Sequence, residues 1–311
     1  MPIQGVYIVP HGCLIFSPED LPDYSSKILP LNSSLSLISD EIYSLNPDLI
    51  VLTTPHGISL LNSFGVYCGY EGSGSSEWHG KYTEFTANLE FDRKEALNFI
   101  EFVKEKHKTM PIEGIVSFIE SMPIPLRWSE VVPSFFLKER WTKNAIDKTE
   151  YSEPRRPFPK FLIISVPRSR LDLSGNLLEN SLEFGQLMAE YFGKSEKKVV
   201  FLQSGDLAHT HEIKTGKFKN DPQPYPIQKD AFESFDAVLG EWAKDPLKNE
   251  GLLLKLAESL GIYLSCGYVT FVMMQGILRK LEKEKRNVVS EVLCNESPTY
   301  FGMMVSRHLI K

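Results

Sequence analysis

The chain has 311 residues and carries 34 Lys and Arg against 40 Asp and Glu, a formal net charge of −6 with histidine neutral. Its isoelectric point near 5.7 and mean hydropathy of −0.17 predict no general attraction to nucleic acid or to an anionic membrane surface. No apolar run approaches the ~18 residues of a membrane span, and the first residues lack the pattern of a signal peptide. The four cysteines include no C-x-x-C pair, so we expect a cytoplasmic protein with reduced thiols.

The first predicted element is a buried strand over residues 6–9, which ends at Pro10-His11-Gly12. A loop rich in Ser, Pro and Asp follows over residues 17–30, and apolar spacing then predicts a helix from Ser34 to Leu45. The next apolar run, Leu49–Thr53, stops at Pro55-His56-Gly57. Short apolar runs bounded by Pro and Gly are typical of buried parallel strands.

The rest of the chain continues this alternation of strands and helices. A Gly/Ser-rich tract at 69–76 and the segment 121–137 predict loops, and a polar, proline-punctuated stretch predicts a loop insertion around 143–159. Strands are predicted at 161–166, 199–204 and 300–309, and helices at 95–108, 181–192, 230–242, 252–259 and 269–281. The pattern predicts an α/β fold, a single domain over residues 1–311, with a mainly parallel central sheet and helices on both faces.

Histidines follow three of the predicted strands: His11, His56, and His209 with His211. Open α/β sheets keep their ligand sites at the carboxyl ends of the strands, so a shared site there is favoured. Two neutral imidazoles with a carboxylate or thiolate make a divalent-metal site, and a further histidine suits proton transfer. The alternative is that these imidazoles cap loops or form hydrogen bonds in the core.

Cys266 precedes Gly267 and the start of an apolar helix. A helix N-terminus favours a thiolate, so this cysteine is a candidate metal ligand or nucleophile. The competing interpretation is a small core residue. The sequence contains no G-x-G-x-x-G, Walker, G-x-S-x-G or H-E-x-x-H motif, which leaves the histidine-bearing loops as the main chemical signal.

Five segments together resemble the class III extradiol dioxygenase superfamily of the LigB type, which includes the Memo-like proteins. Their order and separations fit along essentially the entire chain, and they are Val9-Pro-His11-Gly12, the run from Pro47 to Gly57, Ser204-Gly-Asp-Leu-Ala-His209, Val132–Leu137, and Cys266-Gly-Tyr with Gln275–Leu278. The resemblance implies a LigB-like fold. It also implies that His11 and His56 are metal ligands and that His209 is the acid/base beside the substrate.

Two positions depart from the family pattern. The third ligand is normally a carboxylate or histidine just before the final long helix, where this chain has Leu264-Ser-Cys266-Gly. Memo-like relatives carry cysteine in this region, so Cys266 is the natural substitute. The family usually has Asp-His-Gly before the Val-Pro segment, whereas this chain has Arg127-Trp128-Ser129. Trp128, Ser204 and His211 are the candidate substrate-pocket residues.

The resemblance leaves two functions open. The first is a non-haem Fe(II) dioxygenase that cleaves a catechol-like aromatic diol with O₂. The second is a Memo-like protein that uses the same pocket to bind a metal or a peptide without ring cleavage. The thiolate makes zinc or copper as plausible as iron, and a homo-oligomer is a further expectation.

Overall fold

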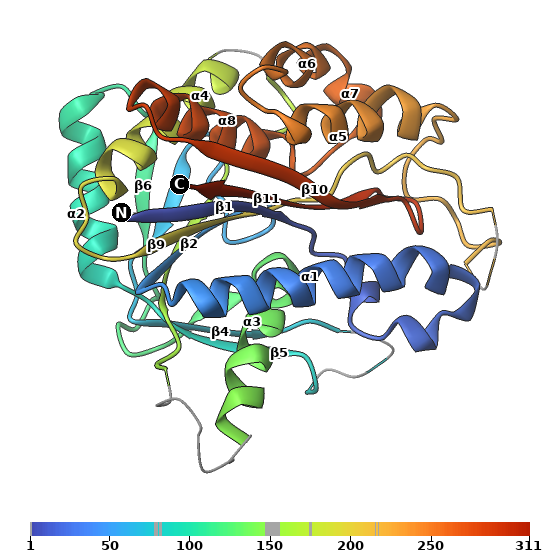
Figure 1. Cartoon of the computed structure of the whole chain (residues 1–311), viewed down its shortest axis with the longest axis horizontal. Helices are drawn as coiled ribbons and strands as arrows, with labels where there is room; N and C mark the ends of the chain where they lie inside the picture. The colour runs from blue at the N-terminus through green and yellow to red at the C-terminus, as the bar shows by residue number, and fades with distance from the viewer. Residues whose placement is uncertain are drawn as a thin grey trace.

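The computed structural model describes residues 2–77, 80, 83–146, 156–173, 176–214, 216 and 218–311. One sheet of eight strands runs through the molecule, in the order β10-β11-β1-β9-β2-β8-β3-β6 (Figure 1). The bounds of these strands are β1 Ile3–Val9, β2 Leu49–Thr54, β3 Phe64–Tyr67, β6 Ile112–Ile115, β8 Lys160–Ser165, β9 Val199–Ser204, β10 Val288–Glu296 and β11 Met303–Ile310.

The centre of the sheet is parallel. Strands β1, β9, β2 and β8 pair in parallel. On one side of them β11 pairs antiparallel with both β1 and β10, and on the other side β3 pairs antiparallel with β8. This arrangement confirms the predicted α/β fold with a mainly parallel sheet. Four neighbouring strands therefore present their carboxyl ends at one edge, where ligand sites of open α/β sheets lie.

Helices cover both faces of the sheet, because the side chains of each central strand are buried on alternating sides. In β1, Val6 and Ile8 join one core with the helices α2, α4, α5 and α8, while Tyr7 and Val9 join the other with α1 and α3 (Figure 1). The helix bounds are α1 Ser25–Leu45, α2 Arg93–Lys106, α3 Trp128–Ile146, α4 Leu177–Phe192, α5 Ala237–Lys244, α6 Glu250–Lys255, α7 Leu260–Tyr263 and α8 Tyr268–Lys283.

The Gly/Ser-rich tract is a strand, so the prediction of a loop there was wrong. Residues Glu71–Ser75 form β4, the middle strand of a second sheet between β5 (Thr86–Glu90) and β7 (Ile124–Leu126). A Cβ atom at Gly74 would overlap the backbone oxygen of Leu126. The glycines thus allow β4 to approach its neighbour closely, which overrides their low strand propensity.

Two helices extend into segments predicted as loops. Helix α1 begins at Ser25 and contains Pro30, and α3 begins at Trp128 and contains Pro133. Each proline lies beyond the first turn of its helix, so each removes one intrahelical hydrogen bond. Helix α3 continues to Ile146, and residues 147–155 of the predicted insertion lie outside the described residues.

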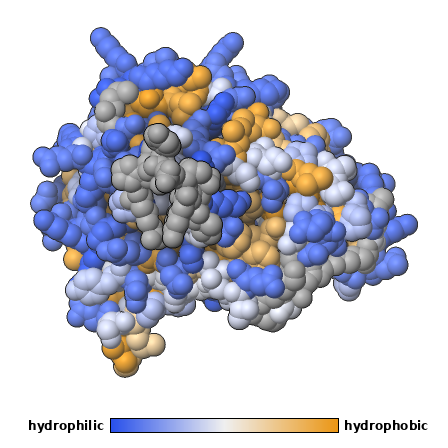
Figure 2. Space-filling model, turned by 60° about the horizontal axis from the view of Figure 1, so that its bottom comes forward, coloured by the Kyte–Doolittle hydropathy of each residue, from blue (hydrophilic) through white to orange (hydrophobic). Residues whose placement is uncertain are grey.

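Hydrophilic residues dominate the face of the molecule shown in Figure 2, with hydrophobic residues in separate areas. None of the helices in the described part of the chain has the length and apolar character needed to span a bilayer.

Candidate metal centre

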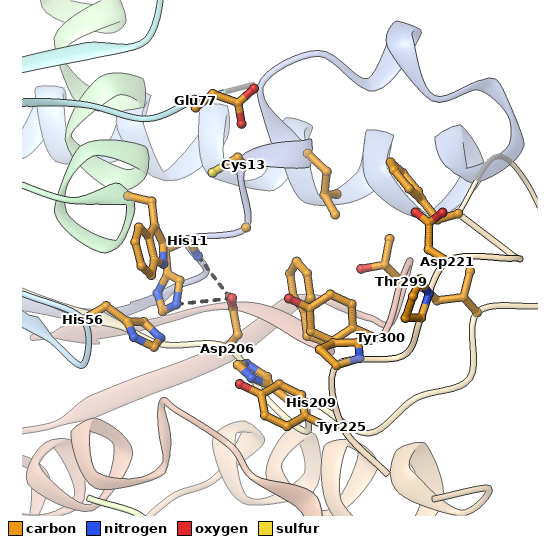
Figure 3. Close-up of a pocket in the computed structure, with 18 residues that line it drawn as sticks. His11, Cys13, His56, Glu77, Asp206, His209, Asp221, Tyr225, Thr299 and Tyr300 are labelled. Carbon is orange, nitrogen blue, oxygen red and sulfur yellow. Dashed lines mark hydrogen bonds and ion pairs between the residues drawn. The ribbon is translucent and has the colours of Figure 1, made fainter. Parts of the chain in front are cut away.

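The loops that follow β1, β2 and β9 bring His11, His56 and His209 to one edge of the sheet, as the strand ends predicted (Figure 3). Cys266 joins them from the segment before α8. The loop after β9 touches the start of α8, since a Cβ at Gly205 would overlap the Cα of Gly267. This close approach, which requires glycine on both sides, carries the cysteine to the histidines.

His11, His56 and Cys266 each offer one ligand atom, and these atoms all lie within 4.8 Å of one another. The Sγ atom of Cys266 is 3.5 Å from Nε2 of His11, and the two imidazole rings meet edge to face with centroids 5.1 Å apart. Cys266 is therefore part of the cluster rather than a core cysteine turned away from it.

The tautomer of His11 follows from its hydrogen bonds. The Ser204 hydroxyl donates to the backbone oxygen of Ser129 at 2.8 Å, so it accepts from Nδ1 of His11 at 2.9 Å. Nδ1 then carries the proton, and the lone pair of Nε2 faces Cys266. A second partner that fixes the ring and its tautomer is typical of metal-ligating histidines.

Asp206 is a member of the site that the sequence analysis did not single out. Its Oδ2 lies 3.3 Å from Nε2 of His11, and its Oδ1 accepts the backbone N–H of His11 at 3.1 Å. Burial raises the pKa of this carboxyl to about 7, against the lowering effect of the His11 N–H. With His209 and Cys266 it forms a second group of ligand atoms within 4.8 Å.

The sequence did not point to Asp206 as a ligand, because the family pattern places the third ligand in the window before α8. The sequence feature that could have identified Asp206 is its position just after a predicted strand. It stands between Ser204 and His209, which were both candidate site residues.

The donor set fits a divalent metal ion. Metal–ligand bonds of about 2.0–2.3 Å in a tetrahedral sphere place donor atoms roughly 3.3–3.7 Å apart, which matches the separations of His11 Nε2 from Cys266 Sγ (3.5 Å) and from Asp206 Oδ2 (3.3 Å). Burial lowers the pKa of His11 and brings that of His56 to about 3. Both imidazoles are thus neutral, the form that binds metals.

Burial raises the pKa of the Cys266 thiol far above its ordinary value, and the Asp206 carboxylate adds to the rise. The backbone N–H of Asp206 donates to Sγ at 3.4 Å and acts in the opposite direction. The positive charge of a bound metal ion would stabilise the thiolate form of Cys266, as it does for other cysteines that coordinate metals.

A cavity of about 550 Å³ opens beside this cluster. Figure 3 shows His11, His56, Asp206 and His209 on one side of it. The lining combines these polar groups with a largely apolar and aromatic remainder, which includes Leu14, Trp128, Ile213, Phe218, Pro222, Pro224, Tyr225, Tyr300 and Phe301. A few convergent polar groups in an apolar pocket of this size are typical of a small-molecule site.

His209 points into the cavity between aromatic rings. Its ring centroid lies 5.8 Å from that of Tyr225 and 5.9 Å from that of Phe301. Among the described residues its buried Nε2 has no hydrogen-bond partner. Burial, with the charge of Arg170, lowers the pKa of His209 to about 4, so the imidazole is neutral near pH 7.

The three candidate substrate-pocket residues have different places. Trp128 lines the cavity, 39% exposed, with its ring 5.2 Å from that of His56. Ser204 is fully buried and contacts His11 rather than the cavity. His211 turns away, with Nε2 2.7 Å from Asp236, whose other oxygen accepts the backbone N–H of Ala208. His211 therefore braces the loop that carries His209.

The family model for the catalytic LigB subunit of aromatic ring-opening dioxygenases matches residues 5–305. Among solved structures, the crystal structure of the uncharacterized protein JW3007 from Escherichia coli K12 is similar in fold, with a TM-score of 0.52 and 14% sequence identity over 98% of this chain and 99% of that one. No protein with a curated description matches. The match over nearly the whole length confirms the resemblance found in the sequence: the chain belongs to the LigB family of aromatic ring-opening dioxygenase subunits.

Proposed function

We propose that the chain is a metal-dependent dioxygenase that opens a catechol-like aromatic diol with O₂ in the extradiol manner. The observation that carries the proposal is the grouping of His11, His56 and Cys266 within 4.8 Å, with the Asp206 carboxylate against His11, at one side of an aromatic-lined cavity. Membership of the LigB family supports the same reaction class.

His11 and His56 would hold the ion, with the Cys266 thiolate as third ligand and Asp206 as the nearest carboxylate. Fe(II) is the choice that the family favours, and zinc or copper would also suit a set of two imidazoles and a thiolate. When bound, an iron centre would supply the redox chemistry that O₂ requires and the positive charge that favours an ionised diol.

The chain's own residues would orient the ring and move a proton. Trp128, Tyr225 and Tyr300 offer flat faces in the cavity for an aromatic ring. The neutral His209, whose Nε2 is unpartnered among the described residues, would accept a proton from a diol hydroxyl and return it as the ring opens. O₂ would be the only oxidant, and both of its oxygen atoms would remain in the product.

A Memo-like protein without ring cleavage is the second candidate function. Two observations favour it: a thiol rather than a carboxylate approaches His11 from the segment before α8, and Trp128 stands beside His56 where the family usually carries a substrate-side histidine. In that case the same pocket would bind a metal or a peptide and consume no O₂.

Oxygen uptake separates the two candidates. The protein is loaded anaerobically with Fe(II), its metal content is measured, and O₂ consumption is followed with a panel of small catechols. We expect uptake of one O₂ per diol with a ring-opened product. No uptake with any diol at full metal occupancy would contradict the dioxygenase and favour the second candidate.

Two variants test the assigned roles. His209→Ala is expected to lower kcat by about 10²–10⁴-fold with metal content unchanged, since it removes the proton acceptor. His56→Ala is expected to lose the metal itself. His107→Ala, at the end of α2 and away from the cavity, is the matched control and is expected to behave as wild type.

A further inference from the structure

The loop that carries His56 is held from behind by a buried tyrosine, Tyr67, the last residue of strand β3. The Tyr67 side chain is fully buried, and its hydroxyl accepts the backbone N–H of Ile58 at 2.7 Å. The backbone carbonyl of Ile58 accepts the Ser165 hydroxyl, also at 2.7 Å. Buried side chains therefore fix both backbone groups of a residue two positions after the proposed metal ligand.

Glu130 in turn fixes the Tyr67 hydroxyl. This hydroxyl donates to Oε1 of Glu130 at 3.2 Å, and Oε2 accepts the backbone N–H of Arg127 at 2.9 Å. Burial and the Glu130 charge raise the pKa of Tyr67 far above its ordinary value, so the hydroxyl keeps the proton that it donates. A Cβ atom at Gly57 would overlap both the Glu130 carboxyl and the Tyr67 hydroxyl. Glycine at this position therefore allows the loop to lie directly against the pair.

The first turn of α3, which contains Glu130, also reaches the two proposed histidine ligands through Ser129. The hydroxyl oxygens of Ser129 and Thr54 lie 2.5 Å apart, and the Thr54 oxygen accepts the backbone N–H of His56 at 3.4 Å. The backbone carbonyl of Ser129 accepts the Ser204 hydroxyl, which orients His11. This turn of helix therefore contacts the supports of both histidines.

We propose that Tyr67 is a positioning residue which, held by Glu130, sets the place of His56 relative to His11. The inference rests on the proposed function, in which both histidines bind one metal ion. Metal–ligand bonds of about 2.0 Å tolerate little displacement of the donor atoms, so a loosened loop lowers metal affinity. Neither Tyr67 nor Glu130 lines the cavity, so their contribution concerns the geometry of the ligands and not contact with the substrate.

Tyr67→Phe tests the inference, because it removes only the hydroxyl and leaves the ring in place. It is expected to weaken Zn(II) binding about 10-fold, the low end of the usual effect of replacing a residue that supports a ligating histidine, measured by competition with a chromophoric chelator. The visible absorption spectrum of the Co(II)-loaded protein, which reports ligand geometry, should differ from that of wild type. In the metal-free protein the amide hydrogens of residues 55–58 should exchange about 10-fold faster, since the Ile58 N–H loses its acceptor.

Tyr7→Phe is the matched control. It removes another fully buried tyrosine hydroxyl, which donates to Glu41 at 2.7 Å and lies away from the cavity. This variant is expected to keep the zinc affinity, the cobalt spectrum and the exchange of residues 55–58 found in wild type. Unchanged zinc affinity in Tyr67→Phe, or an equal loss in Tyr7→Phe, would overturn the inference. Failure of the proposed function would show instead as absent O₂ uptake in wild type, with the faster exchange of residues 55–58 in Tyr67→Phe preserved.

Discussion

Ser204 is a buried side chain outside the cavity that orients His11, the proposed metal ligand. Its hydroxyl is committed to the carbonyl of Ser129 and can only accept from His11. Replacing such a partner of a ligating histidine usually costs about 10–100-fold in metal affinity. Ser204→Ala is therefore expected to weaken Zn(II) binding by that factor, measured by competition with a chromophoric chelator.

The matched control is Ser181→Ala, which removes a buried serine hydroxyl bonded to Leu177 within α4. It is expected to leave zinc affinity unchanged. Equal affinities in Ser204→Ala and wild type would show that the tautomer of His11 is fixed by something else.

The sequence alone identified His11, His56 and Cys266 as candidate ligands. It did not predict which side chains surround them. The strand-end positions of the histidines are visible in hydrophobic patterning. Asp206 and Arg170 are ordinary charged residues in sequence, and only tertiary burial distinguishes them from solvated ones. His211 had the same local signal as His209, and its commitment to Asp236, 25 positions away, depends on the fold.

At the element scale, the start of helix α3 holds a buried carboxyl that makes stability depend on pH. Glu130 accepts the backbone N–H of Arg127 at 2.9 Å and the Tyr67 hydroxyl at 3.2 Å, and burial raises its pKa from 4.5 to about 7. The folded state thus holds this proton more tightly than the unfolded state. Stability contributed by the protonated form is present below about pH 4.5 and is lost as pH rises to about 7.

Glu130→Gln should remove this dependence, which is on the order of 3 kcal/mol. Urea unfolding of wild type and variant between pH 5 and 8 is the measurement, with a shallower fall in the free energy of unfolding expected for the variant. An unchanged m-value shows that both unfold from the same state. Parallel pH profiles would contradict the assignment.

Helices α4 and α8 pack closely because of two glycines. A Cβ at Gly185 would overlap the backbone oxygen of Met273, and a Cβ at Gly276 would overlap that of Leu182. Gly185→Ala is expected to force the helices apart and to destabilise the fold by about 1–3 kcal/mol, in the range of overpacked cores. Chemical denaturation measures the change.

Gly251→Ala is the control, because a Cβ there meets nothing within 4 Å and the residue lies in helix α6. Alanine favours an exposed helix by up to about 1 kcal/mol, so this variant should be as stable as wild type or more so. A Gly185→Ala protein of unchanged stability would show that the helices can separate without cost.

Several element boundaries could not be predicted from local pattern. Pro30 and Pro133 are ordinary helix-breaking signals, yet α1 and α3 include them because their apolar stripes are buried against the sheet. The Gly/Ser tract forms β4 through contacts with Leu126, about fifty residues later in the chain. Tertiary packing overrode propensity in each case.

For the whole molecule, metal binding should stabilise the fold. The candidate ligands come from segments after β1, β2 and β9 and before α8, so an ion would join parts of the chain far apart in sequence. A ligand that binds only the folded state at 100 times its Kd stabilises by about 2.7 kcal/mol. We expect Zn(II) to raise Tm and a chelator to reverse the rise.

His11→Ala is the control for that shift and is expected to show none. A rise in Tm of equal size in wild type and His11→Ala would place the ion elsewhere.

The predicted homo-oligomer, the single-domain organisation and the cytoplasmic location stay predictions.

The proposed function depends on the binding of one metal ion by His11, His56 and Cys266 together. X-ray absorption at the zinc edge of the zinc-loaded protein tests it most directly. We expect imidazole nitrogens at about 2.0–2.1 Å and one sulfur at about 2.3 Å, with the sulfur absent in Cys266→Ser. A spectrum with no sulfur neighbour, or the same spectrum from wild type and Cys266→Ser, would contradict it.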